Sequence, residues 1–242
     1  VDEMAKLMLD QEETLPLHST ADLREAFLKT RIEGTFLEVN DLVDIRQNAL
    51  MVQSVTTFLL KRDDIRFGHL KQLATPVQNF PEVLKRIDAI LNKYGEIKDN
   101  ASSDLLDIRR NMNIVRGKVN QSFGSALTQY NALGYLDDIK ESFVQNRRVL
   151  AVLAMYRRKV KGSILGSSKT GSIAYIEPEA TLQYSRELSN LEYEEKEEIT
   201  RILKQLSNQI RPFLPLLIKY QDFLSDIDVI AAKAKYANKI NG

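Results

Sequence analysis

SFVQNRRVLAVLAMYRRKVKGSILGSSKTGSIAYIEP, residues 142–178, stands apart from the rest of the 242-residue chain. Short runs of β-branched and aromatic residues alternate in it with Gly162, Gly166 and Gly171, a pattern typical of strands joined by tight turns. The chain on both sides has the apolar spacing of long helices. The sequence therefore predicts a small antiparallel β element between two helices.

The same stretch is strongly basic on a nearly neutral chain. It holds no acid before Glu177, whereas the whole sequence has 34 Lys and Arg against 33 Asp and Glu. A local positive field of this kind favours a polyanion such as the phosphate backbone of a nucleic acid, without information on base sequence. The alternative is a solvated charged surface with no partner. The predicted nucleic-acid-binding residues are Arg147, Arg148, Arg157, Arg158, Lys159, Lys161 and Lys169.

The flanking helices carry narrow apolar seams. A seam of this width suits one partner helix rather than a broad core. At 1.5 Å per residue, the two helices predict an antiparallel stalk of roughly 40–48 Å with the β element at its tip. The seam positions are Leu105, Ile108, Met112, Val115 and Val119, and then Leu188, Leu191, Ile199, Ile202, Leu206 and Ile210.

The predicted fold class is mainly α, with a helical core, a long antiparallel helical stalk and a small antiparallel β element. In the core, one long helix is expected to bury Leu42, Ile45, Ala49, Val52, Val55 and Leu59. The predicted divisions are a helical core (1–102), a first lever helix region (103–141), a basic β clamp element (142–176), a second lever helix (177–211) and a returning core helix (212–242).

The sequence offers no catalytic or metal site. The chain has no cysteine, and His18 and His69 lack neighbours that would form a triad or a metal site. The acidic run between Glu192 and Glu198 spreads around a helix, which indicates a solvated face rather than a cation site. The glycines around Lys169 lack the context of a phosphate-binding loop. We therefore expect no catalytic residue, no metal and no cofactor in this chain.

Membrane insertion is not expected either. No apolar run is long enough to cross a bilayer, and the N-terminus has no secretory signal pattern. We expect a cytoplasmic protein with no membrane partner. Because the chain starts at Val1 rather than Met, it is consistent with a piece of a longer protein.

Several segments together resemble the MutS family, specifically its paralogue without the mismatch-reading N-terminal domain. They are residues 147–178, the continuation EATLQYSRELSNLEYEEKEEITRIL at 179–203, GEIKDNASSDLLDIRR at 95–110 and IDVIAAKAKYA at 227–237. The strongest motif is TGSIAYIEP, residues 170–178, which leads into a Glu-rich helix.

This resemblance implies a core, paired levers and a DNA clamp. It also implies a parent protein that is a homodimer, with a separate C-terminal ATPase domain that binds ATP and Mg and moves the levers. The implied partner is duplex or branched DNA, in recombination control or repair. The ribosome or RNA is an alternative partner, and a helical protein-interaction scaffold is an alternative function. Whether the protein is an enzyme is left open: no catalytic site is expected in this chain, but the resemblance implies that the parent protein is an ATPase.

Overall fold

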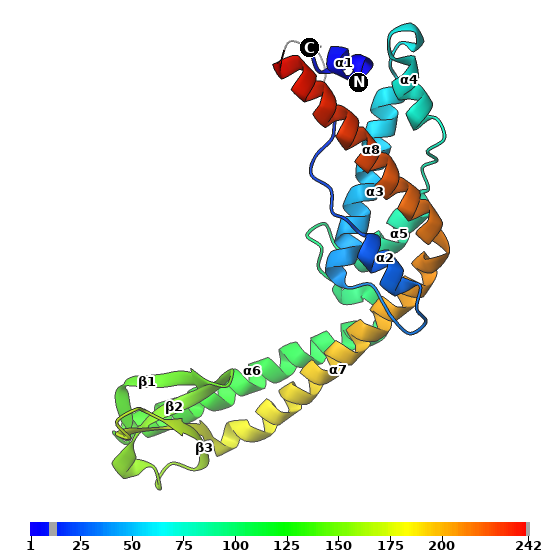
Figure 1. Ribbon diagram of the computed structural model, residues 1–242. Coiled ribbons are helices and arrows are strands. Elements are labelled where there is room, and N and C mark those ends of the chain that lie inside the picture. Colours follow the sequence, from blue (N-terminus) through cyan, green and yellow to red (C-terminus); the bar gives the residue numbers. More distant parts are fainter. Residues whose placement is uncertain (10–13, 241–242) are drawn as a thin grey trace. The chain divides into compact units, whose positions relative to one another are not determined.

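The computed structural model, which describes residues 1–9 and 14–240, confirms a mainly α chain with a small antiparallel sheet (Figure 1). Residues 10–13 and 241–242 of the predicted core segments lie outside the described residues. The chain forms two compact units. Unit 1 comprises Val1–Ala101 with Thr200–Gly242, and unit 2 comprises Ser102–Ile199.

The regular secondary structure of unit 1 is helical apart from one isolated bridge between Leu91 and Ile97, within the described residues. The helices are α1 (Asp2–Leu9), α2 (Arg24–Thr30), α3 (Val39–Leu60), α4 (Asp64–Ala74), α5 (Pro81–Ile90) and α8 (Leu214–Lys239). The long helix α3 buries the predicted face, each residue of which is at most 5% exposed. Helices α1, α2 and α3 all contact α8.

A buried polar network joins three of these helices. The Oε1 atom of Gln221 on α8 accepts hydrogen bonds from Asn48 Nδ2 of α3 at 3.1 Å and from the Leu23 amide at 3.4 Å. Asn48 Nδ2 also donates to the Ala21 carbonyl at 3.1 Å. Buried amides are tolerated when they are paired in this way, so the network fixes the entry of α2 against α3 and α8.

Unit 2 is built on α6 (Ser103–Ala132) and the first part of α7 (Glu179–Ile210). Contacts between them run in opposite directions along the two helices, as an antiparallel pair requires. Ser102 Oγ bonds Glu198 Oε1 at 2.6 Å, Arg109 Nε bonds Glu195 Oε1 at 2.7 Å, and Ser122 Oγ bonds Thr181 Oγ1 at 3.3 Å. The antiparallel pairing predicted from the seams is present within this unit.

Two details of this pair differ from the sequence prediction. Glu195 and Glu198 of the acidic run do not lie on a solvated face, because they bond partners on or beside α6, and Glu198 is only 8% exposed. The expected seam residues Ile202, Leu206 and Ile210 are buried, but they belong to unit 1. There the Leu37 amide donates to Ser207 Oγ at 2.8 Å.

A four-stranded antiparallel sheet completes unit 2, with strand order β1-β2-β4-β3. The sheet begins earlier than the predicted residue 142, because β1 already pairs with β2 at Leu136. The start of β1 is polar, and the register shifts between Leu136 and Glu141, so the alternation of apolar and polar residues is hidden in the sequence. The strands are β1 (Leu136–Val144), β2 (Arg147–Leu153), β3 (Gly162–Ser167) and β4 (Ile173–Pro178).

The C-terminal half of α6 carries this sheet. Phe123, Ala126 and Tyr130 pack with Leu150 and Ile176 of the two central strands in one hydrophobic core. Close approach of β3 to β4 depends on Gly162, since a Cβ there would lie 2.1 Å from the Glu177 carbonyl oxygen. The sheet is thus held by its own small core.

Candidate nucleic-acid interface

The structure separates the seven predicted cations into two kinds. Arg147 lies at the start of β2, where its Nη1 donates to Glu177 Oε2 at 3.0 Å. The Glu177 side chain is only 1% exposed. Burial of a carboxylate is costly unless a cation accompanies it, so Arg147 is held as the partner of Glu177.

Arg148 is likewise occupied inside unit 2. Its Nη2 donates to Glu141 Oε2 at 2.6 Å, and its Nη1 donates to Asn120 Oδ1 of α6 at 3.2 Å. Its guanidinium also covers the Phe123 ring at 4.3 Å. These contacts tie the sheet to α6. The sequence prediction that no acid compensates these positives is wrong for Arg147 and Arg148.

The other five cations are exposed and form no ion pair within the part of the chain that the structure describes. They lie outside the strands, in the loop between β2 and β3 and in the turn between β3 and β4. We call them the exposed cations: Arg157, Arg158, Lys159, Lys161 and Lys169.

The loop of residues 154–161 is anchored at several points, so that its cations are presented in a defined conformation. The Tyr156 ring stacks on Tyr135 with centroids 4.5 Å apart, and Val160 is only 5% exposed. The Lys161 amide donates to the Tyr130 hydroxyl at 3.2 Å, and the Lys161 carbonyl accepts from the Glu179 amide at 3.0 Å. Presentation on an anchored loop reduces the entropy lost on binding.

The turn that carries Lys169 lies beside the start of this loop. The Ala154 amide donates to the Ser172 carbonyl at 2.9 Å, and Gly171 with φ +71° closes the turn by donating to the Ser168 carbonyl at 2.9 Å. Ser172, at the end of this turn, and Ala154, at the start of the loop, are therefore neighbours, although more than ten positions separate them in the sequence.

One feature near the exposed cations was not foreseen. Asp137 and Asp138 follow Leu136, which pairs with Val152, so the start of β1 brings two acids to this end of the sheet. Two tyrosines lie beside the exposed cations: Lys159 Nζ is 5.7 Å from the ring centroids of both Tyr135 and Tyr156. The field here is positive but less one-sided than the sequence alone indicated.

Catalytic alternatives find little support in the described residues. No group of three or more His, Asp or Glu among them could hold a metal ion. His69 lies in an exposed contact, with Nδ1 2.6 Å from Glu3 Oε1. Burial acts to raise the pKa of Glu3, but hydrogen bonds from the Leu70 and His69 amides and from the His69 side chain outweigh it and lower that pKa. The contact between Glu3 and His69 thus joins α1 to α4.

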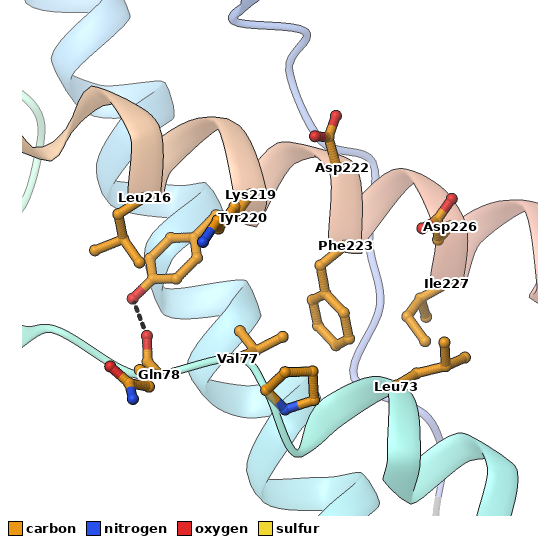
Figure 2. A pocket seen from close by; sticks show the side chains of 11 residues that line it. Leu73, Val77, Gln78, Leu216, Lys219, Tyr220, Asp222, Phe223, Asp226 and Ile227 are labelled. Atoms are coloured by element: carbon orange, nitrogen blue, oxygen red, sulfur yellow. Dashed lines mark hydrogen bonds between the residues drawn. The ribbon is translucent and has the colours of Figure 1, made fainter.

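One cavity of about 490 Å³ lies within unit 1, between α8 and the segment after α4 (Figure 2). Its lining is mostly apolar, with Leu73, Val77 and Phe223 pointing into it. Tyr220 is not free for chemistry, because its hydroxyl donates to the Gln78 carbonyl at 2.7 Å and accepts from the Phe80 amide at 3.0 Å. Burial raises the pKa of Tyr220. The cavity contains no arrangement of nucleophile and base.

Among the described residues, no helix combines the length and apolar character needed to cross a bilayer. The molecular class is therefore a mainly α chain in which paired helices carry a small sheet with exposed cations.

Within that class, the chain is similar to curated proteins named endonuclease MutS2. That of Geobacillus sp. (strain WCH70) is 29% identical over 228 residues, which cover 93% of this chain and 29% of the relative. The protein of Alkaliphilus metalliredigens is 30% identical, over 98% of this chain and 30% of the relative. The protein of Aquifex aeolicus is 22% identical, over 99% of this chain and 31% of the relative. These similarities support the MutS-family resemblance.

No protein-family model matches the chain. The chain spans about three tenths of the length of the curated relatives that it matches.

Proposed function

We propose that this chain is the core, lever and clamp region of a MutS-like protein without the mismatch-recognition domain, and that it binds duplex or branched DNA. The observation that carries the proposal is the group of exposed cations on an anchored loop and its adjacent turn. Solvated cations in a fixed arrangement can neutralise phosphates and release counterions, which is the main source of sequence-independent affinity.

The role of the rest of the longer protein follows from the same proposal. ATP hydrolysis with Mg would reside in a C-terminal domain of a homodimer, and it would act on the helical pair of α6 and α7. The cellular process would be recombination control or DNA repair in the cytoplasm. The similarity to proteins named MutS2 supports this assignment, because it extends over nearly the whole chain.

A salt titration of binding to a labelled duplex tests the proposal. We expect steep salt dependence for the wild-type chain, and replacement of Arg157, Arg158, Lys159 and Lys161 by Gln should reduce the log-log slope by roughly 0.9 for each phosphate that is no longer neutralised. Binding should weaken for every duplex sequence alike, because phosphate contacts carry no base information.

A matched control removes the same charge from unit 1 by replacing four exposed lysines of α8 with Gln: Lys219, Lys233, Lys235 and Lys239. This variant should keep the wild-type slope. If both variants are folded and have the same slope, the exposed cations are not the contact. Tighter binding to duplex RNA than to duplex DNA would favour the ribosomal alternative.

A further inference from the structure

A large apolar side chain projects from the same loop as the exposed cations. Met155, in the 3-10 turn Ala154–Tyr156, is 76% exposed. By contrast, Met4 and Met112 are at most 2% exposed. A single exposed apolar residue is common on protein surfaces, so its significance depends on its position.

The position of Met155 is fixed on both sides by backbone contacts. Its predecessor, Ala154, bonds the Ser172 carbonyl at 2.9 Å, next to the turn that holds Lys169. Its successor, Tyr156, is stacked on Tyr135, and the following Arg157 amide donates to the Ala154 carbonyl at 3.3 Å. Met155 is therefore an apolar side chain on a constrained turn, which begins beside Ser172, at the end of the turn that carries Lys169, and ends at Arg157.

We infer that Met155 is a wedge that enters an unstacked base step when the neighbouring cations hold the phosphates. This inference rests on the proposed DNA binding and adds a preference for one kind of DNA. A methionine side chain is unbranched and polarizable, which suits contact with irregular apolar surfaces such as the faces of bases. Inserted apolar side chains partly unstack base steps at an energetic cost. A duplex already unstacked at one step avoids part of that cost, so it is the favoured ligand.

The test compares two DNA probes with the same number of phosphates. One is a linear duplex, and the other has the same sequence with a single abasic site beside a 2-aminopurine. The wild-type chain should bind the abasic probe more tightly, by roughly fivefold, and should increase its 2-aminopurine fluorescence. Met155→Ala should lower this ratio to near one and leave the affinity for the linear duplex nearly unchanged. Met155→Leu should retain most of the preference, since it keeps the apolar volume.

Ile139→Ala is the matched control, because Ile139 is a 74% exposed apolar residue on β1 of the same unit. It should keep the wild-type ratio. Equal binding of both probes by the wild-type chain, or an unchanged ratio in Met155→Ala, would overturn the wedge and leave the proposed DNA binding intact. Absence of binding to either probe would overturn both.

Discussion

At the scale of single residues, Arg147 and Arg157 show how two arginines of one basic stretch acquire different roles. Arg147 neutralises Glu177, whose side chain is buried at the end of β4. Arg157 is exposed at the C-cap of the turn that carries Met155 and forms no ion pair in the described chain. The first therefore belongs to stability and the second, under the proposal above, to binding.

Arg147→Ala is expected to destabilise unit 2, because it leaves the buried Glu177 carboxylate without its cation. The expected cost is about 3 kcal/mol in the free energy of unfolding, measured by urea denaturation. Arg157→Ala should change that free energy by less than about 0.5 kcal/mol. Two results would contradict the assignment. One is an unchanged free energy of unfolding in Arg147→Ala, and the other is a double variant, with Glu177 also changed to Gln, that recovers none of the lost stability.

At the scale of elements, the pairing of α6 and α7 combines an apolar seam with polar contacts. Leu105, Met112 and Val115 of the seam are at most 2% exposed. Arg109 and Glu195 add an ion pair at 2.7 Å in which both side chains are 24% exposed. A partly buried ion pair of this kind contributes modest net stability, because the cost of desolvating the two charges offsets part of their attraction.

A double-mutant cycle on Arg109→Ala and Glu195→Ala measures this pair directly. We expect a coupling energy of about 1 kcal/mol, since both groups are shielded from water but not fully desolvated. The corresponding cycle on Arg110 and Asp107 should give a smaller value, because this exposed pair is separated by 4.0 Å. Equal coupling in the two cycles would show that shielding between the helices has no influence.

Helical elements were predictable from sequence because their signal is local. The spacing of Leu42, Ile45 and Val52 identifies the buried face of α3 without knowledge of its partners. The start of β1 was missed, because Asp137 and Asp138 obscure the alternation and the register shifts before Glu141. Such a strand is defined by its neighbour β2, which the local pattern does not contain.

For the candidate site, the basic stretch was evident from the sequence, but the ion pairs of its members were not. The density of positive charge identified the stretch that contains the exposed cations, which all lie in residues 157–169. The pairing of Arg147 and Arg148 could not be foreseen, because their partners are Glu177, thirty positions away, and Glu141 and Asn120, which lie outside the basic stretch. Charge pairing across a sheet becomes visible only after the strands are in register.

At the scale of the whole molecule, the two units have separate cores, so a local perturbation should remain within one of them. Tyr220 illustrates this in unit 1, where its hydroxyl connects α8 to Gln78 and Phe80. Its side chain is almost fully buried, at 4% exposure.

Tyr220→Phe is expected to lower the stability of unit 1 by about 1–2 kcal/mol, because it leaves the Phe80 amide and the Gln78 carbonyl without this partner. Amide hydrogen exchange should accelerate in α8 and residues 74–80, with no change in the sheet of unit 2. Acceleration throughout both units would contradict their independence.

The raised pKa of Tyr220 adds a pH dependence with a defined sign. Burial favours the neutral phenol in the folded state, so its contribution is fully present below the unfolded pKa of about 10 and is lost as the pH rises toward the higher folded value. Wild-type unit 1 should therefore lose stability above about pH 10 more steeply than Tyr220→Phe. Parallel stability curves for the two proteins would show that Tyr220 does not contribute.

The division into units also has a consequence for the order of folding during synthesis. Unit 2 is a continuous segment, whereas unit 1 also needs Thr200–Gly242, which the ribosome produces after unit 2. Unit 2 can therefore fold before α8 has been synthesised, whereas α1, α2 and α3 cannot complete their packing until α8 is available. Closing a flexible loop of residues 102–199 would cost roughly 4 kcal/mol in chain entropy. The folded unit 2 already holds Ser102 and Glu198 in contact at 2.6 Å, so most of that entropy is lost before the nascent chain completes unit 1.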